Sequence, residues 1–191
     1  TQTPIDYVSY PVRQFESKDL DLKLTTNFNF LTVAQLSPRK NVHQLITCFI
    51  EQFKDNEKVG LIIKANMAKN SLIDRKSTLA NFKQLIKSRD HKCKIYLLHG
   101  FLTDEEMAGL YTHPKINAIV STSHGEGFGL PLFEAAYSGL PVIATDWSGH
   151  LDFLVGKVSG KNKKLFAKID FELKKVQKQA VWKDIVIEES R

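Results

Sequence analysis

Short apolar runs alternate with longer segments of helical period along most of the chain. The runs are rich in Val, Ile, Leu and Phe, which favour strands, and they span Phe28 to Ala34, Val59 to Lys64, Lys94 to Leu98, Ile116 to Ser121 and Pro141 to Ala144. Strands that alternate with helices in this way are typical of βαβ units around a parallel sheet. We therefore predict an α/β fold with a doubly wound parallel sheet.

The segments between these strands carry apolar residues at helical spacing. The clearest stripe consists of Val42, Leu45, Ile46, Phe49, Ile50 and Phe53. Asn41 with Gln44 predicts a capping pair at the start of this helix. A second helix is expected through Leu79, Phe82, Leu85 and Ile86.

Local start and stop signals define the later helices. Thr103 with Glu106 forms a capping box that opens a helix burying Met107 and Leu110. Pro131 suits the first turn of the next helix, and Gly139 with Pro141 ends it. After Gly160 the spacing predicts a narrow helical stripe through Phe166, Ile169, Leu173 and Val176.

Length and composition fit one soluble domain spanning residues 1–191, without repeats or a low-complexity linker. No apolar run approaches the roughly 20 residues that a membrane helix needs. Cys48 and Cys93 have no metal-site spacing and form no disulfide framework, which favours a reducing compartment. We expect a cytoplasmic protein.

The formal net charge of +6 is compatible with nucleic acid, anionic lipid or a phosphorylated ligand as a partner. Much of this charge lies late in the chain, at Lys161, Lys163, Lys164, Lys174, Lys175 and Lys178. A solvated helix face is the favoured interpretation of these lysines, and a docking surface for a membrane or a partner is the alternative. Nucleic-acid binding is disfavoured because the lysines are not interleaved with aromatic residues.

The most informative segment, residues 121–134, lies between a predicted strand and a predicted helix. Gly125, Gly127 and Gly129 leave a turn without side chains, whose backbone N–H groups lead into a helix N-terminus. Such a turn suits a diphosphate, because the unpaired donors and the helix dipole both favour negative charge there. Glycine spacing alone is weak evidence, since glycines also serve plain tight turns.

Two glutamates make the prediction of a ligand site more specific. Glu126 lies inside the anion-binding loop, where a carboxylate repels phosphate unless it turns toward hydroxyl groups, such as those of a sugar. Glu134 falls about one turn into the helix and is expected to point back toward the N-terminus. Both carboxylates are therefore expected to flank one ligand.

These residues resemble a known signature. GEGFGLPLFEA, with seven residues between Glu126 and Glu134, and the following GLPVIATDWSGHLDFL resemble retaining GT-B glycosyltransferases, especially glycosyltransferase family 4. VAQLSPRKNVHQLI looks like the first strand and phosphate-binding loop of that family, and HGFLTDEEMAGLY like its nucleotide-base loop. The resemblance runs from about Phe28 to Leu154 and implies a Rossmann-like domain that binds a nucleotide diphosphate sugar.

The resemblance also implies roles for individual residues. Lys40, with Arg39 as an adjacent candidate, takes the place of the lysine that neutralises the donor pyrophosphate. Glu134 matches the glutamate that binds ribose hydroxyls, and Glu126 the one that contacts the sugar near the reacting carbon. The donor would also be bordered by backbone of the glycine-rich loop and by the base loop, at Gly127, Phe128, Gly129, Leu130, Leu102 and Thr103.

The chain departs from the family in two ways. Ala34-Gln35 stands where many members have Gly-Arg, so Gln35 offers a hydrogen bond in place of a second charge, and Asn41 replaces a frequent glycine. A GT-B enzyme also has an N-terminal acceptor domain, and the resemblance implies that this chain is only the donor half. TQTPIDYVSYPVRQF looks like the end of the interdomain crossover, and WKDIVIEESR like the run before the last helix.

We expect no metal and no cofactor beyond the donor substrate. Asp19-Leu-Asp21 has the form of a metal motif but lies outside the matched region. His99 and His124 are expected to border the cleft, with His124 the better functional candidate, while a lone loop histidine such as His150 is interpreted as a hydrogen-bonding surface group. The expected partners are the nucleotide sugar, an unidentified acceptor, the N-terminal domain and, through the whole enzyme, a membrane surface.

Two other functions fit parts of the pattern. A dinucleotide-dependent oxidoreductase is suggested by the three glycines and by Asp146, which lies where a ribose-binding acid belongs. The glycine spacing is nevertheless GxGxG and not GxGxxG. A non-catalytic module that kept the fold is disfavoured by the intact Lys40, Glu126 and Glu134.

Overall fold

The computed structural model describes residues 8, 10–67, 70–87 and 89–176. Six parallel strands form one sheet in the order β3-β2-β1-β4-β5-β8. They are β1 (Phe28–Gln35), β2 (Val59–Asn66), β3 (Lys94–His99), β4 (Ile116–Ser121), β5 (Val142–Thr145) and β8 (Ala167–Ile169). The predicted α/β fold class is confirmed, and each predicted strand is present.

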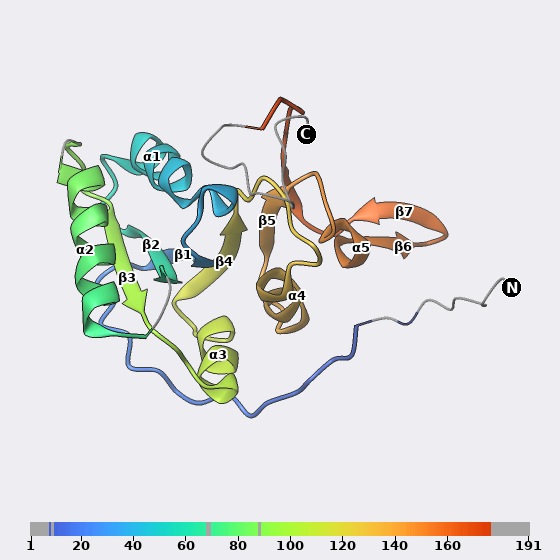
Figure 1. Cartoon of the computed structure of the whole chain (residues 1–191). Helices are drawn as coiled ribbons and strands as arrows, with labels where there is room; N and C mark the ends of the chain where they lie inside the picture. The colour runs from blue at the N-terminus through green and yellow to red at the C-terminus, as the bar shows by residue number, and fades with distance from the viewer. Residues whose placement is uncertain (1–7, 9, 68–69, 88, 177–191) are drawn as a thin grey trace, which may run out of the picture.

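Helices connect these strands and cover both faces of the sheet (Figure 1). They are α1 (Val42–Phe53), α2 (Leu72–Lys87), α3 (Asp104–Tyr111), α4 (Leu130–Tyr137) and α5 (Leu151–Leu154), with a short 3₁₀ helix, η1 (Pro38–Lys40). The two faces follow from alternation along the strands, because successive side chains point to opposite sides. Leu61 and Ile63 pack in the core with α1 and α2, whereas Ile62 packs in the core with α3, α4 and α5.

The start and stop signals predicted most helix ends correctly. The Thr103 side chain accepts a bond from the Glu106 N–H, and the Glu106 carboxylate accepts one from the Thr103 N–H, so the capping box of α3 is confirmed. Pro131 lies in the first turn of α4. The expected Asn41–Gln44 capping pair is wrong: Asn41 makes no side-chain cap and adopts φ 52°, while Gln44 donates to Cys48 Sγ.

The helix expected after Gly160 is also wrong. The chain instead forms an antiparallel hairpin from β6 (Val155–Val158) and β7 (Lys161–Lys164), followed by β8. Ser159 and Gly160 form the turn with φ values of 52° and 77°, a turn type that joins hairpin strands. The helical spacing arose because Phe166 and Ile169 pack on separate core clusters from an extended segment.

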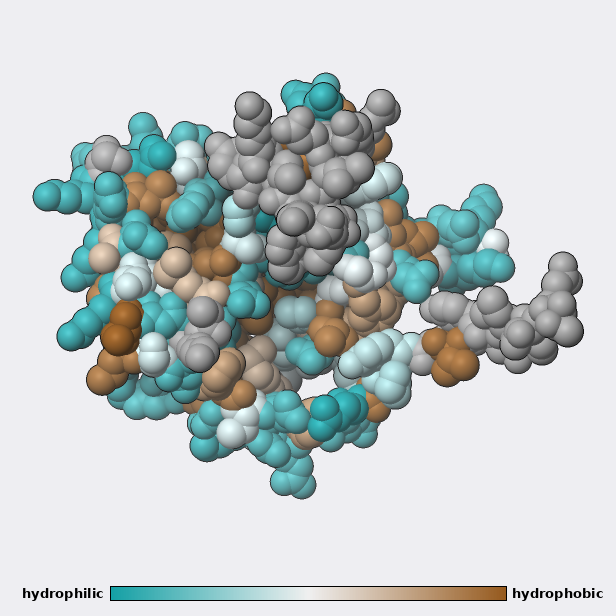
Figure 2. All heavy atoms as spheres, in the orientation of Figure 1, coloured by the Kyte–Doolittle hydropathy of each residue, from teal (hydrophilic) through white to brown (hydrophobic). Residues whose placement is uncertain are grey.

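This hairpin projects from the body of the domain beside α5 (Figure 1). Its outer end presents mainly hydrophilic side chains (Figure 2), and all residues of β7 are exposed. Lys161, Lys163 and Lys164 are therefore exposed on a strand and not on the expected helix face, and the choice between a solvated face and a docking surface stays a prediction. Lys178 lies outside the described residues.

The segment before β1 runs in extended form along α3 and α4 (Figure 1). The Lys18 N–H donates to the Glu105 carbonyl at 3.0 Å, and Gln14 Nε2 donates to the Tyr137 hydroxyl at 2.6 Å. This part of the chain therefore belongs to the fold and covers one helical face. Most of TQTPIDYVS and the run WKDIVIEESR lie outside the described residues.

Among the described residues, no helix is both long and apolar enough to cross a bilayer. Within the same residues, no three His, Cys, Asp or Glu side chains are grouped as a metal site would require.

Candidate functional site

The candidate site lies where the order of the sheet reverses. β1 has β2 on one side and β4 on the other, so the connections from β1 through α1 and from β4 through α4 lead in opposite directions. The loops that follow β1 and β4 therefore meet beyond the carboxyl ends of adjacent strands. In open α/β sheets this reversal point is where ligands bind.

Backbone and hydroxyl contacts join the two loops. The Arg39 carbonyl accepts a bond from the His124 N–H at 2.9 Å and from Ser123 Oγ at 3.2 Å. Thr122 Oγ1 donates to the Asn41 carbonyl at 3.2 Å. Asn41 can adopt its left-handed conformation because asparagine tolerates positive φ better than most residues. The turn after η1 is thereby fixed against the glycine-rich loop.

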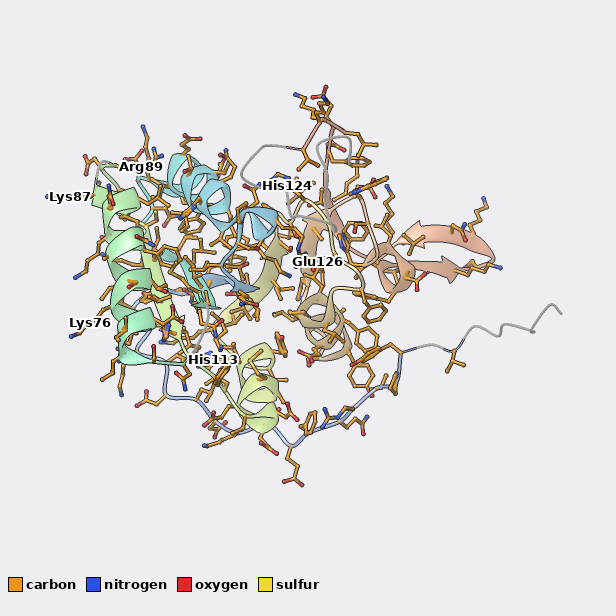
Figure 3. The ribbon with its side chains drawn as sticks, in the orientation of Figure 1. Lys76, Lys87, Arg89, His113, His124 and Glu126 are labelled. Carbon is orange, nitrogen blue, oxygen red and sulfur yellow. The ribbon has the colours of Figure 1, made fainter. Side chains whose placement is uncertain are left out.

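Ion pairs between side chains also connect these two loops. Glu126 Oε1 lies 2.5 Å from Lys40 Nζ, and Oε2 lies 3.0 Å from Arg39 Nη1 (Figure 3 labels Glu126). The side chains of Glu126 and Lys40 are 9% and 14% exposed, whereas that of Arg39 is 50% exposed. Arg39 also donates to the Gly125 carbonyl. The two predicted cations and the predicted carboxylate are thus brought together, but the carboxylate faces the cations directly.

The environment of Glu126 acts on its ionisation in two directions. Burial disfavours the charged form, but the hydrogen bonds and positive charge of Lys40 and Arg39 outweigh it. The pKa of Glu126 therefore lies below its ordinary value of 4.5, and the side chain is ionised near neutral pH.

The end of the glycine-rich loop presents backbone donors. Gly129 adopts φ 91° as the N-cap of α4, a conformation that glycine reaches without strain. Within the described chain, the N–H groups of Phe128, Gly129 and Leu130 donate to no other residue. They open at a helix N-terminus beside Lys40, where a small pocket is lined by Val33, Lys40, Ile119, Val120, Ser121, Glu126, Gly129, Pro131 and Leu132.

A third loop, after β5, supports the glycine-rich loop from behind. Ser148 Oγ accepts from the Glu126 N–H and donates to the Glu126 carbonyl, both at 2.7 Å. The Gly149 N–H donates to the same carbonyl at 3.0 Å, and a Cβ on Gly149 would lie only 2.0 Å from the Gly127 oxygen. The sequence alone did not identify Ser148 and Gly149 as part of the site. The only sequence signal for them is a Ser-Gly pair that follows a predicted strand.

Aromatic packing holds Phe128 in place. Its ring contacts those of Tyr10, Phe133 and Phe153 at centroid distances between 5.0 and 5.3 Å. The sequence assigned only backbone donors to Phe128. The side chain anchors the tip of the loop, so those donors are held in position from the opposite side.

Glu134 has a different environment from Glu126. It accepts a hydrogen bond at 3.0 Å from the hydroxyl of Tyr111, which lies in α3. Partial desolvation of the carboxylate raises the pKa of Glu134, and the Tyr111 hydrogen bond opposes this rise only in part. The two glutamates are therefore held by separate partners, and their shared ligand stays a prediction.

The remaining predicted residues are those of the base loop and three histidines. Leu102 packs on the same core cluster as Leu132, and Thr103 uses its hydroxyl to cap α3, so these two residues offer mainly their backbone to a base. His99 was expected at the cleft, but it is buried beside Asp74 with 4% of its side chain exposed. His124 is exposed, and His150 is buried and bonds the Thr145 carbonyl at 2.6 Å.

Comparison with known proteins shows what this arrangement resembles. The family described as Glycosyl transferases group 1 matches residues 13–168. A serotype-specific mannosyltransferase, WbdA of Escherichia coli, is 35% identical over 120 residues, which cover 62% of this chain and 13% of the mannosyltransferase. A sucrose synthase of Melioribacter roseus is 29% identical over 134 residues, 68% of this chain and 17% of the synthase. The chain thus spans a minor part of the length of these relatives.

Solved structures show the same fold. The C-terminal domain of a glycosyl transferase group 1 family protein from Francisella tularensis gives a TM-score of 0.53 at 21% identity, covering 71% of this chain and 66% of that one. HepE of Anabaena, solved in complex with UDP-glucose, gives a TM-score of 0.52 at 22% identity, covering 69% of this chain and 33% of that one.

Replacing Gly149 by Ala is expected to destabilise the domain, because the new methyl group would collide with the Gly127 carbonyl. Overpacking against backbone costs about 1–3 kcal/mol. Denaturant unfolding measures the loss. Gly127→Ala is the matched control, since a Cβ at Gly127 meets nothing within 4 Å. Equal stability of the two variants would show that the loops are not in contact.

The depressed pKa of Glu126 predicts a pH-dependent contribution to stability. The contribution is present above the ordinary pKa of 4.5 and is lost as the pH falls through the lower folded value. Glu126→Gln should therefore reduce the free energy of unfolding at neutral pH by about 1–3 kcal/mol, because Lys40 loses its charged partner. The difference from the parent protein should shrink with acidification in paired unfolding curves. A difference that stays constant with pH would contradict the ion pair.

Proposed function

This chain belongs to the Glycosyl transferases group 1 family, and we propose that it binds the sugar donor, a nucleotide diphosphate sugar, of a glycosyltransferase that retains anomeric configuration. The observation that carries the proposal is the convergence of Arg39, Lys40 and unpaired backbone N–H groups at the reversal point of the sheet. Cations and N–H groups together suit a diphosphate.

The donor is expected to lie across the two loops. Lys40 and Arg39 take the pyrophosphate with the N–H groups of Phe128, Gly129 and Leu130. Glu134 takes the ribose diol, since a carboxylate accepts from two neighbouring hydroxyls. Glu126 contacts the sugar, and the backbone of Leu102 and Thr103 borders the base.

The proposed reaction needs charge stabilisation more than acid or base chemistry from this domain. The bond from the anomeric carbon to the diphosphate oxygen breaks, and its electron pair stays on the diphosphate. An acceptor hydroxyl forms the new bond on the same face of the sugar and gives its proton to the departing phosphate oxygen. Lys40 and the loop N–H groups stabilise the negative charge that develops on the leaving group.

The acceptor is expected to be held by another domain, as in a GT-B architecture, and this chain alone is expected to transfer no sugar. A hexose is the favoured sugar because the matched relatives include a mannosyltransferase and a sucrose synthase. The cytoplasmic location and the contact of the whole enzyme with a membrane stay predictions.

The dinucleotide alternative has lost its support. Asp146, the acid that would hold the ribose of such a cofactor, instead forms an ion pair with Lys164 across to β7. Glu126, paired with Lys40 and Arg39, would also place a carboxylate beside the pyrophosphate of the dinucleotide. Family membership and these contacts favour the glycosyl donor.

Glu134→Ala is expected to weaken binding of both a nucleoside diphosphate and its sugar conjugate, because both carry the ribose. The expected loss is about 1–3 kcal/mol for hydrogen bonds to a charged group. Calorimetry with uridine and guanosine diphosphates and their hexose conjugates measures it. Glu57→Ala, which removes an exposed carboxylate outside the site, is the control. Unchanged affinity for every ligand would place the ribose elsewhere.

Donor binding is expected to need no divalent metal, because Arg39, Lys40 and the N-terminus of α4 supply the positive charge. The affinity for the nucleotide sugar should therefore be the same in EDTA and in excess Mg²⁺. Calorimetry under the two conditions checks this, and a large loss of affinity in EDTA would contradict it.

A further inference from the structure

The Glu126 carboxylate occupies the cations that the proposed diphosphate requires. Both of its oxygens are engaged, one by Lys40 at 2.5 Å and the other by Arg39 at 3.0 Å. Lys40 is mostly buried and makes its only side-chain bond within the described residues to this carboxylate. The site therefore already contains an internal anion.

A phosphate group and this carboxylate compete for the same donors. An ammonium or guanidinium group forms its strongest hydrogen bonds with one anion in good geometry, and two anions on the same cations repel each other. The charges of Arg39, Lys40 and Glu126 sum to only one positive charge, whereas the two cations alone carry two. A diphosphate therefore binds strongly only if the carboxylate moves away.

The loop is built so that the side chain can move while the backbone stays fixed. Ser148 holds both the N–H and the carbonyl of Glu126, and Gly149 holds the same carbonyl. Gly125 and Gly127 flank Glu126 and place no side chain in its path, and the space beside Gly127 is open. Rotation about the side-chain bonds of Glu126 therefore leaves the loop intact.

We propose that Glu126 is a specificity-determining residue that makes the site prefer a nucleotide sugar over the bare nucleoside diphosphate. In the presence of a sugar, its hydroxyl groups draw the carboxylate away from Lys40 and Arg39, which then bind the pyrophosphate. Without a sugar, the carboxylate returns to the cations and weakens diphosphate binding. The inference rests on the proposed function and adds an internal competitor to it.

The preference has a direct consequence for turnover. Transfer of the sugar leaves the nucleoside diphosphate in the site, and no sugar hydroxyl then remains for Glu126 to bind. The carboxylate returns to Lys40 and Arg39 and speeds the release of the product. The depressed pKa of Glu126 supports this role, because a protonated side chain would not compete for the cations.

The test is calorimetry of the full chain with three probes: inorganic pyrophosphate, a nucleoside diphosphate and its hexose conjugate. Glu126→Gln keeps the size of the side chain and removes the charge. It should bind pyrophosphate and the nucleoside diphosphate about tenfold more tightly, and the sugar conjugate less tightly, so that the preference for the conjugate falls at least about tenfold. Glu57→Gln removes an exposed carboxylate and controls for net charge.

The possible outcomes distinguish failure of this inference from failure of the proposed function. If the parent protein binds nucleotides but Glu126→Gln binds the diphosphate with the same or weaker affinity, the competition is refuted and the donor site stands. If neither protein binds any nucleotide or nucleotide sugar, the proposed function fails as well. Should Glu126→Gln not fold in a thermal unfolding check, Glu126→Asp serves in its place. Its shorter side chain keeps the charge but cannot span both cations, and it should give a smaller gain in the same direction.

Discussion

The ion pair between Lys40 and Glu126 is the interaction on which the geometry of the site depends. It joins a loop after β1 to a loop after β4, and these loops are otherwise linked by a few contacts through Arg39 and Asn41. Because both side chains are mostly buried, each charge needs a hydrogen-bonding or oppositely charged partner. The pair therefore links a cation from one βα unit to the loop that leads into the helix N-terminus of another.

The fold supplies the reason why these two loops meet at all. A parallel sheet brings all strand ends of one kind to one edge, but only at a reversal of strand order do neighbouring connections diverge and leave a gap between them. The order β2-β1-β4-β5 places this reversal between β1 and β4. Other elements then support the glycine-rich loop. The loop after β5 holds the backbone of Glu126, and the rings of Phe133 and Phe153 pack against Phe128.

Features set by local sequence were predictable, and those set by contacts across the chain were not. The five strands and the Thr103–Glu106 capping box follow from residues close together in the sequence, and the structure confirms them. The helix expected after Gly160 failed because Phe166 and Ile169 have a helical spacing by coincidence, while pairing of Ala167–Ile169 with β5 decides the conformation. Asn41 tolerates positive φ, and the left-handed conformation that it adopts excludes the expected cap.

The site shows the same limit. Lys40, Arg39 and Glu126 were selected from the sequence, yet their mutual contact depends on the approach of two loops 86 positions apart. The sequence predicts that a carboxylate in an anion site turns toward hydroxyl groups, whereas in the structure Glu126 pairs with the two cations of the site. Ser148 and Gly149 leave no charge pattern in the sequence, because Ser148 acts through its hydroxyl and Gly149 through its backbone N–H.

Glu126 and Glu134 are eight positions apart in the sequence, yet they lie in different electrostatic environments. Glu126 is held ionised by two cations, whereas the pKa of Glu134 is raised by desolvation beside a tyrosine hydroxyl. An ionised carboxylate on shared cations responds to any competing anion, so Glu126 senses the charged part of a ligand. A carboxylate that already accepts from a hydroxyl, and has no cation bonded to it, suits neutral hydroxyl groups. The difference in environment, and not the residue type, therefore separates the two glutamates: Glu126 competes with an anion for Lys40 and Arg39, whereas Glu134 accepts from a neutral hydroxyl.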